Sequence, residues 1–257
     1  MRLVRFHTRK LEPTYGWVYG EKIGLIEGVP YGDYRRLEAE IDIHSVELLP
    51  PTQPSKIICV GRNYIEHAKE HGVEVPEVPL LFLKPPSTLI GNGMPIVLPP
   101  QSNQVEHEAE LAVVIGKRGR WIAPGDAAEY VFGYTVANDV TARDLQRRDG
   151  QWTRGKGFDT FCPVGPWIET DLDAFDLLIT CRVNQDIRQM ASTRDMVFSI
   201  PQLIAYASSF MTLEPGDLLL TGTPAGVSPL AAGDVVEVSI EGIGELTNPV
   251  VEEAQIA

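Results

Sequence analysis

Three glutamates lie at alternate positions where a polar segment leads into an apolar one, between Gln104 and Gly116. The second half of this segment has the composition of a β-strand, and strand alternation would place Glu106, Glu108 and Glu110 on one face. Like charges this close repel one another unless a cation or another partner neutralises them. Carboxylate ligands favour a hard divalent cation such as Mg²⁺ or Mn²⁺, whereas zinc prefers histidine or cysteine. From these residues alone, an acidic strand face in contact with solvent stays an equal alternative.

The composition is that of a folded globular protein with an acidic surface. The chain has 257 residues, of which 44% are hydrophobic, and a formal net charge of −13 at pH 7. This charge argues against nucleic acid or an anionic membrane as the main partner, whereas a cation is easily accommodated. No apolar run is long enough to span a membrane, and residues 1–7 lack the pattern of a signal peptide. We therefore expect a cytoplasmic protein.

The cysteines predict neither a disulfide framework nor a zinc site. Cys59, Cys162 and Cys181 are odd in number, widely spaced and include no Cys-x-x-Cys pair. We expect three buried free thiols.

A proline-rich segment, Leu49–Pro54, is the best candidate for a domain boundary. Proline fixes φ and lacks a backbone donor, so this segment can continue neither a helix nor a central strand. The residues before it form short alternating segments typical of strands, and Tyr34–Glu40 has a helical pattern. We therefore expect a small N-terminal module at residues 1–54 and a metal-binding catalytic domain at residues 55–257.

A short helix is expected directly after the apolar strand Lys56–Val60. Asn63 is placed to cap this helix, and Gly72 to end it. His67 and Glu70 lie one turn apart on it, so the carboxylate can hold one imidazole nitrogen and leave the other free as a general base. A salt pair on the helix surface is the alternative, since charge pairs with this spacing are common.

Three further polar residues lie at strand ends or in loops. Asp139 ends the expected strand 131–140 and completes the carboxylate set, unless it only caps the helix that follows. Lys156 is flanked by two glycines and can pair with an anionic group, although an ordinary loop lysine is the alternative. Thr223 offers a hydroxyl and a backbone amide in the tight loop 222–227.

Six short motifs follow one another along the chain. They are Val-Gly-Arg-Asn-Tyr-x-x-His-x-x-Glu (60–70), Phe-Leu-Lys-Pro (82–85), His-Glu-Ala-Glu-Leu (107–111), Asn-Asp-Val-Thr-Ala-Arg-Asp-Leu-Gln (138–146), Gly-Lys-Gly-Phe-Asp (155–159) and Thr-Gly-Thr-Pro-Ala-Gly-Val (221–227). In this order and spacing they are highly specific, and over about residues 55–250 the chain resembles the fumarylacetoacetate hydrolase family. The resemblance implies an α+β, β-rich fold, in which a mixed β-roll with a small strand-rich N-terminal module carries a divalent metal. It also implies a homodimer.

The resemblance assigns roles by position in this sequence. The ligands of Mg²⁺ or Mn²⁺ fall on Glu108, Glu110 and Asp139. Glu106 is left outside the ligand set, at the surface or behind the ligands. The family's histidine and nearby glutamate fall on His67 and Glu70, which with Lys156 form the expected catalytic set. The positions around the substrate carboxylate and the developing oxyanion fall on Arg62, Gln146, Lys156 and Thr223.

The implied function is that of a metal-dependent enzyme acting on small 2-oxo acids. A 2,4-dioxo acid would chelate the metal, and cleavage of its C3–C4 bond would give a metal-bound enolate that Lys156 and Gln146 stabilise. Hydrolysis of acylpyruvates or decarboxylation of oxaloacetate ranks first, because His67 and Glu70 supply a group that can activate water. Isomerisation or decarboxylation of substrates such as 2-hydroxyhepta-2,4-diene-1,7-dioate is the second hypothesis. A non-catalytic protein that is stabilised by metal and binds a ligand is the third.

Overall fold

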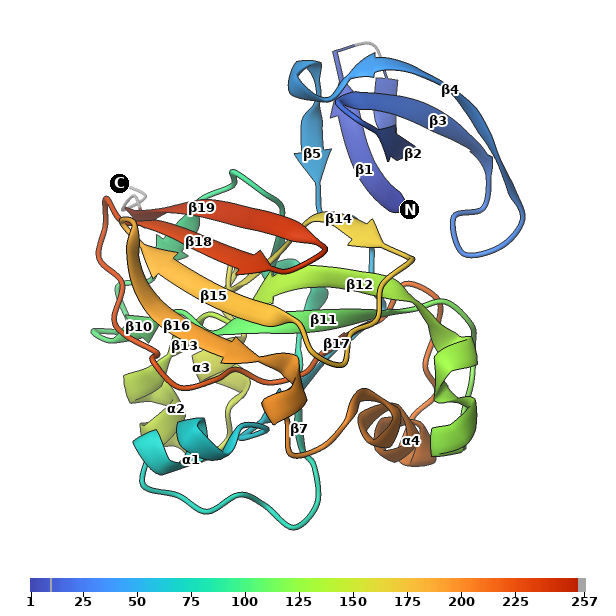
Figure 1. Ribbon diagram of the computed structural model, residues 1–257. Helices are drawn as coiled ribbons and strands as arrows, with labels where there is room; N and C mark the ends of the chain where they lie inside the picture. The colour runs from blue at the N-terminus through green and yellow to red at the C-terminus, as the bar shows by residue number, and fades with distance from the viewer. Residues whose placement is uncertain (10, 254–257) are drawn as a thin grey trace.

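The computed structural model describes residues 1–9 and 11–253, in which strands predominate (Figure 1). Among these residues, twelve strands form one long mixed sheet, five form a second sheet and two form a short ribbon. The expected β-rich fold of the α+β class is confirmed.

Five N-terminal strands form one end of the long sheet. They are β1 (Arg2–Thr8), β2 (Leu11–Tyr19), β3 (Lys22–Gly28), β4 (Tyr34–Asp42) and β5 (Glu47–Leu49). Strand β1 pairs with β2 and β5, and it also pairs with β14 (Cys162–Glu169), where Leu3 lies opposite Ile168. The N-terminal strands therefore continue the long sheet, in the order β4-β3-β2-β1-β14. A division of the chain after residue 54 stays a prediction.

The helix pattern expected for Tyr34–Glu40 is wrong, because this segment belongs to β4. Leu37, Ala39 and Ile41 are half-buried, and the charged residues between them are exposed. That period of two suits a strand, and antiparallel pairing with β3 satisfies its backbone hydrogen-bonding groups.

The remaining strands of the long sheet are arranged around β11. They are β6 (Ile57–Gly61), β7 (Leu80–Lys84), β8 (Leu89–Ile90), β11 (Ala109–Ile115), β12 (Val131–Asn138), β14 and β17 (Leu218–Leu220). Strand β11 is antiparallel to β12 on one side and to β17 on the other, and β17 is parallel to β6. All seven residues of β11 are buried, because both faces of this part of the sheet are covered. The alternative of an acidic strand face in contact with solvent is therefore wrong.

The second sheet packs against the face of β11 and β12 that carries Leu111 and Val136. Its strands, in spatial order, are β16 (Asp186–Ser192), β15 (Leu178–Val183), β18 (Val235–Ile240), β19 (Gly244–Glu252) and β9 (Ile96–Leu98). Ile179, Val238 and Leu246 from this sheet join Leu111 and Val136 in one buried apolar cluster. Strands β18 and β19 form an antiparallel hairpin.

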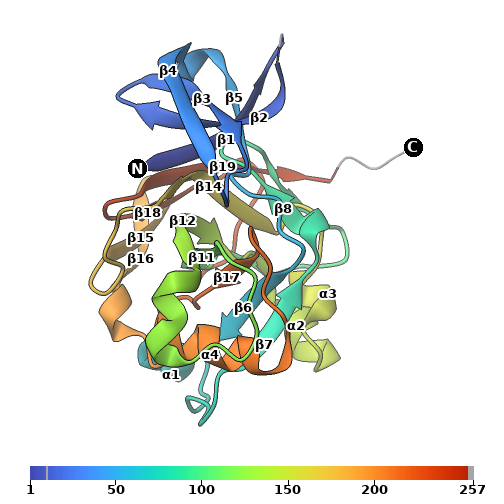
Figure 2. The ribbon, with the colours of Figure 1, turned by 90° about the vertical axis from the view of Figure 1, so that its right-hand side faces the viewer.

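The helices are short and lie at the edges of the sheets. The α-helices are α1 (Ile65–Glu70), α2 (Arg143–Asp149), α3 (Thr153–Lys156) and α4 (Ile200–Phe210), and the 3₁₀ turns are η1 (Ile43–Ser45), η2 (Pro86–Thr88), η3 (Pro124–Tyr130) and η4 (Thr193–Asp195). Helix α4 packs Leu203, Ile204 and Ala207 against the long sheet (Figure 2). Helices α2 and α3 contact one another and the ribbon of β10 (Val105–Glu106) and β13 (Thr141–Ala142). Helix α1 lies at the same lower end of the molecule in Figure 1.

Two expectations about the whole chain concern its thiols and its apolar segments. The three cysteines are buried and free, as expected. Among the described residues, none of the helices has the length and apolar character needed to cross a membrane.

We expect Leu219→Ala to lower the free energy of unfolding by about 2–5 kcal/mol, because Leu219 is fully buried in the cluster beneath α4. Leu83 on β7 is a matched control. It is 47% exposed, so Leu83→Ala should cost about 1 kcal/mol or less. Urea denaturation of both variants measures the difference. Equal losses would contradict the packing described for β17.

Candidate active site

Three carboxylates meet where β11 and β12 lie side by side. Glu108 directly precedes β11, Glu110 is its second residue, and Asp139 directly follows β12. The antiparallel register sets Ala109 opposite Asn138, which brings the three side chains to the same end of the strand pair. All three are buried, and one oxygen of each lies within 4.8 Å of the others. A set of three carboxylate oxygens suits a hard divalent cation such as Mg²⁺ or Mn²⁺.

Two buried lysines donate hydrogen bonds to this carboxylate triad. Nζ of Lys156 donates to Oε2 of Glu108 at 2.7 Å and to Oδ2 of Asp139 at 2.8 Å. Nζ of Lys84 donates to Oδ1 of Asp139 and, at 2.9 Å, to the carbonyl oxygen of Val140. Burial alone would lower the pKa of Lys156, but the two carboxylates raise it, so the ammonium stays charged. The alternative of an ordinary loop lysine is wrong, because Lys156 is buried at the end of α3.

Arg143, the first residue of α2, connects two of the glutamates. Its Nε donates to Oε2 of Glu106 at 2.7 Å, and its Nη2 donates to Oε1 of Glu108. Its Nη1 donates to Oε1 of Gln146 at 2.7 Å. Glu106 also accepts a hydrogen bond from Nε2 of Gln104 at 2.6 Å and is only 4% exposed. A surface position for Glu106 is therefore wrong, and its contact with Arg143 places it behind Glu108.

Glu108 and Glu110 have opposite electrostatic surroundings. Burial alone would raise the pKa of Glu108, but Lys156 and Arg143 hold it well below its usual value. Burial and the neighbouring carboxylates raise the pKa of Glu110 well above its usual value. Glu110 accepts a hydrogen bond from the N–H of Gly222 at 2.7 Å, and no ion pair involves it in residues 1–9 and 11–253. The triad thus contains one carboxylate without a cation, and a bound divalent ion would supply that charge.

The expected histidine–glutamate pair lies on α1, within reach of the triad. His67 is 6% exposed, and its Nδ1 lies 3.4 Å from Oε2 of Glu70. The carboxylate of Glu70 accepts from the N–H of Gly226, at 3.1 and 3.2 Å to its two oxygens. Burial lowers the pKa of His67, which keeps its imidazole neutral. The alternative of a surface salt pair is wrong for His67, because the helix turns this side chain inward.

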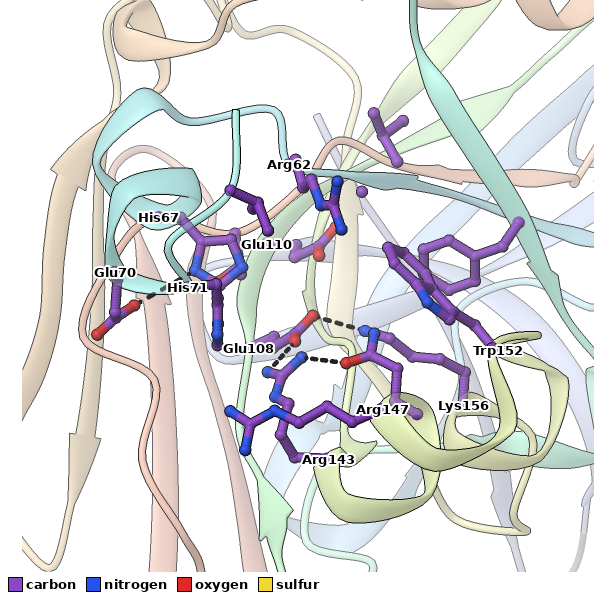
Figure 3. A pocket seen from close by; sticks show the side chains of 17 residues that line it. Arg62, His67, Glu70, His71, Glu108, Glu110, Arg143, Arg147, Trp152 and Lys156 are labelled. Atoms are coloured by element: carbon purple, nitrogen blue, oxygen red, sulfur yellow. Dashed lines mark hydrogen bonds and ion pairs between the residues drawn. The ribbon is translucent and has the colours of Figure 1, made fainter. Parts of the chain in front are cut away.

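One cavity of about 470 Å³ joins the triad to the histidine–glutamate pair (Figure 3). Eight of the nine predicted site residues line it, namely Arg62, His67, Glu70, Glu108, Glu110, Gln146, Lys156 and Thr223. The ninth, Asp139, is not among the lining residues and contacts the cavity through Lys156. The side chains in the lining that were not assigned from the sequence include His71, Phe82, Arg143, Arg147 and Trp152. The structure brings the predicted residues together, and their roles stay predictions.

Two arginines and two aromatic rings, those of Arg62, Arg147, Phe82 and Trp152, also line the cavity. Arg62 has a φ of +60°, an unfavourable conformation for a residue other than glycine, and its guanidinium points into the cavity (Figure 3). Among the described residues, neither Arg62 nor Arg147 forms a recorded ion pair. The rings of Phe82 and Trp152 pack edge to face, with centroids 5.1 Å apart. The cavity lining therefore includes both unpaired positive charge and apolar surface.

The hydroxyl of Thr223 is already occupied by protein partners. It donates to the carbonyl oxygen of Ala109 at 2.9 Å and accepts from Nε2 of Gln189 at 2.8 Å. Oε1 of Gln189 lies 3.0 Å from Nδ1 of the fully buried His107, whose Nε2 lies 3.0 Å from Oγ of Ser228. This network fixes the loop 222–227 against β11. A substrate-binding role for Thr223 therefore depends on groups other than its hydroxyl.

Comparison with known families matches almost the whole chain. A family model described as fumarylacetoacetate (FAA) hydrolase C-terminal matches residues 56–251. A second model, described as Rv2993c-like, N-terminal, matches residues 1–51.

Three similar proteins have described activities. The mitochondrial oxaloacetate tautomerase Fahd2a of Rattus norvegicus is 49% identical over 215 residues, which are 79% of this chain and 69% of that protein. The crystal structure of a 2-hydroxyhepta-2,4-diene-1,7-dioate isomerase from Mycobacterium marinum superposes with a TM-score of 0.92 at 42% identity and covers 99% of this chain and 100% of that one. A maleylpyruvate hydrolase from Sphingobium, in complex with manganese(II) and pyruvate, gives a TM-score of 0.81 at 37% identity, with 99% and 100% covered.

We expect Glu110→Gln to abolish stabilisation by Mg²⁺ or Mn²⁺ without destabilising the metal-free protein. The amide keeps the shape, and it costs the metal-free protein little because burial and the neighbouring carboxylates already favour the neutral form of Glu110. Wild-type protein at a metal concentration of about 100 Kd should gain about 2.7 kcal/mol of stability, and the variant almost none. Thermal unfolding with metal and with EDTA measures both effects.

Glu106→Gln is the matched control, because Glu106 is bonded to Arg143 and lies outside the triad. This variant should be less stable without metal yet keep the metal-dependent gain. A full gain in Glu110→Gln would contradict the assignment of Glu110 as a ligand.

Proposed function

Because the chain belongs to the fumarylacetoacetate hydrolase family, we propose that it is a metal-dependent enzyme that moves a proton at the carbon beside the oxo group of a 2-oxo dicarboxylic acid. The observation that carries this proposal is one cavity that joins a carboxylate triad lacking a cation to a buried histidine–glutamate pair. The triad can hold a metal that stabilises negative charge, and the pair can move a proton.

Glu108, Glu110 and Asp139 would hold Mg²⁺ or Mn²⁺. The fit rests on their oxygen donors, on their close approach and on the lack of a protein cation to stabilise the ionised form of Glu110. A bound ion of this kind would act as a Lewis acid toward the 2-oxo group and favour its enolate. The manganese in the similar maleylpyruvate hydrolase supports the same choice of metal.

Lys156 and Gln146 are placed to stabilise the oxyanion that forms when the 2-oxo acid loses its proton. Lys156 is charged and 2% exposed, and in this low-dielectric position its ammonium acts more strongly than it would in water. The Oε1 of Gln146 is held by Arg143, which leaves the amide NH₂ of Gln146 free to donate toward the cavity. Both donors are fixed before substrate binds, so little reorganisation is needed during the reaction.

His67 is the general base of this proposal, and Glu70 is the residue that orients it. With Nδ1 facing Glu70, Nε2 carries the lone pair that takes the proton from C3 of the substrate. The imidazolium then returns that proton to the carbon or to the oxygen, which interconverts the keto and enol forms. The lowered pKa of His67 keeps it in the basic form at neutral pH. The distance of 3.4 Å to Glu70 would shorten when the imidazole becomes charged.

The distal end of the substrate should carry a second carboxylate. Arg62 and Arg147 line the same cavity as Lys156 and have no recorded ion pair among the described residues. Guanidinium groups bind carboxylates through paired hydrogen bonds. Phe82 and Trp152 would pack against the carbon chain between the two ends of the substrate.

Proton transfer is favoured over cleavage of a carbon–carbon bond as the outcome. The tautomerase and isomerase relatives are 49% and 42% identical to this chain, and the hydrolase is 37% identical. A tautomerase needs a base that takes a proton from C3. His67 and Glu70 can serve in this way without activating a water molecule. Hydrolysis of acylpyruvates is the second candidate, because the same base can activate water. Decarboxylation of oxaloacetate would also give an enolate, by loss of CO₂, and would not need His67 as a base.

A second copy of the chain is the expected partner in a homodimer. Strand β16 is an edge of the second sheet, and Leu178 and Met190 on β15 and β16 are 46% and 58% exposed. Exposed apolar residues on adjacent strands support burial between subunits.

Glu70→Gln and His67→Asn should lower kcat by about 10²–10⁴-fold while the metal still stabilises the fold. Glu66→Gln is the matched control, since Glu66 lies on the same helix and is bonded to Lys69 at the surface. The ultraviolet absorbance of the enol form of oxaloacetate, with Mg²⁺ or Mn²⁺ present, measures turnover. Because burial lowers the pKa of His67 from 6.5, the loss of wild-type activity in acid should lie below pH 6.5. Unchanged turnover in Glu70→Gln would contradict the proposed pair.

Exchange of the C3 hydrogens in deuterated water separates the two outcomes of the reaction. A tautomerase exchanges them faster than it consumes the substrate, as followed by NMR. A hydrolase would convert an acylpyruvate to pyruvate and a second acid. Binding of metal and of oxalate without either reaction would indicate a non-catalytic protein.

Arg147→Gln should raise KM for a 2-oxo dicarboxylate by about tenfold, because it removes one charge-assisted hydrogen bond. It should leave KM for a 2-oxo acid with an uncharged tail almost unchanged. Arg148→Gln is the matched control, since Arg148 is the next residue, does not line the cavity and pairs with Asp149. An equal change in KM for both substrates would show that Arg147 does not bind the distal carboxylate.

A further inference from the structure

Helix α1 and the residue that directly follows it present three potential metal ligands along one side. His67, Glu70 and His71 lie at positions i, i+3 and i+4, and one ligand atom of each lies within 4.8 Å of the others. Figure 3 shows them grouped at one end of the cavity, apart from Lys156 and Trp152. This group shares no residue with the carboxylate triad.

Two nitrogens of this group are buried and unsatisfied. Nδ1 of His67 and Nε2 of His71 have no hydrogen-bond partner among the described residues. His67 is 6% exposed, and the two rings meet edge to face with centroids 4.6 Å apart. A buried polar atom without a partner costs about 1–3 kcal/mol. A ligand that accepts both lone pairs would remove this cost.

We propose that His67, Glu70 and His71 form a second metal site, which takes Zn²⁺ or a similar transition metal. Two imidazole nitrogens and one carboxylate oxygen are the donors that zinc uses in open sites, where a fourth position is left to water. The His-x-x-Glu-His order of residues 67–71 also occurs in a class of zinc proteases, on an unrelated fold. Mg²⁺ and Mn²⁺ prefer the oxygen ligands of the triad, so the two sites differ in selectivity.

Zinc at this second site would inhibit the enzyme, a consequence that rests on the proposed function. A neutral imidazole has one lone pair and one N–H. When Nδ1 of His67 gives its lone pair to zinc, the proton must reside on Nε2, and the nitrogen facing the substrate can no longer accept one. Zinc would also take Glu70 away from its orienting contact. Occupation of the second site and base catalysis by His67 therefore exclude each other.

Equilibrium dialysis against Zn²⁺, with Mg²⁺ in large excess to fill the triad, tests the site itself. Wild-type protein should bind one zinc per chain, and His71→Gln should bind it at least about tenfold more weakly. His44→Gln is the matched control, because His44 is an exposed histidine near Glu21 in the N-terminal strands. It should bind zinc like wild type. Failure of wild type to bind zinc, or full binding by His71→Gln, would overturn the proposal.

Turnover with and without zinc tests the consequence separately. The rate of each protein with zinc is divided by its own rate in Mg²⁺ alone, so a change in basal rate does not affect the comparison. Zinc should inhibit wild type and His44→Gln, excess Mg²⁺ should not reverse this inhibition, and His71→Gln should resist it by at least about tenfold. Zinc that binds in dialysis but leaves the rate unchanged would support the metal site and contradict the role of His67 as base.

Discussion

The burial of charge is the constraint on which the rest of this structure depends. Six nearly inaccessible side chains alternate in sign along one series of contacts, namely Glu106, Arg143, Glu108, Lys156, Asp139 and Lys84. Transfer of a charged group from water to a protein interior costs roughly several kcal/mol, unless ion pairs and hydrogen bonds in the interior compensate the loss of hydration. These partners come from β7, α2, α3 and the ends of β10, β11 and β12, so only the complete fold provides them. Helices α2 and α3 are too short to persist alone, and their ion pairs to the sheet help to hold them.

Glu110 is the point at which this compensation is incomplete. Four buried carboxyl groups, those of Glu106, Glu108, Glu110 and Asp139, stand against the three buried cations Arg143, Lys156 and Lys84. The negative charge that Glu110 would carry therefore has no cation paired with it. A divalent cation would reverse the sign of that charge, and the same cavity would then attract an anion. Under the proposed function, we therefore expect the metal to bind first and the acid second. The acidic character of the whole chain therefore does not prevent the binding of acidic substrates, because the local charge decides.

The sequence predicted the site better than it predicted the supporting contacts. Strand alternation identified Glu106, Glu108 and Glu110 without choosing between them. The family motifs, which are local in sequence, identified Glu108, Glu110 and Asp139, and also His67 and Glu70. Asn63 was expected to cap α1, but its side chain bonds the backbone of Phe198 and Thr221, and a pairing across more than 130 residues has no local signal. Arg143 was missed for the same reason, since its two glutamates lie more than 30 residues away. Glu106 was placed at the surface as one option because nothing near it in sequence shows what covers it.

The proposed metal ligands and the proposed base lie on elements that differ in how firmly the fold holds them. The carboxylates project from β11 and β12, interior strands that are hydrogen-bonded on both sides. His67 and Glu70 project from α1, a helix of six residues. The hydrogen bond from the N–H of Gly226 to Glu70 connects this helix to the loop 222–227. Under the proposed function, substitutions on the helix would alter the groups that move the proton without disturbing the residues that hold the metal. The proteins similar to this chain include a tautomerase, an isomerase and a hydrolase, so closely similar chains differ in the reaction described for them.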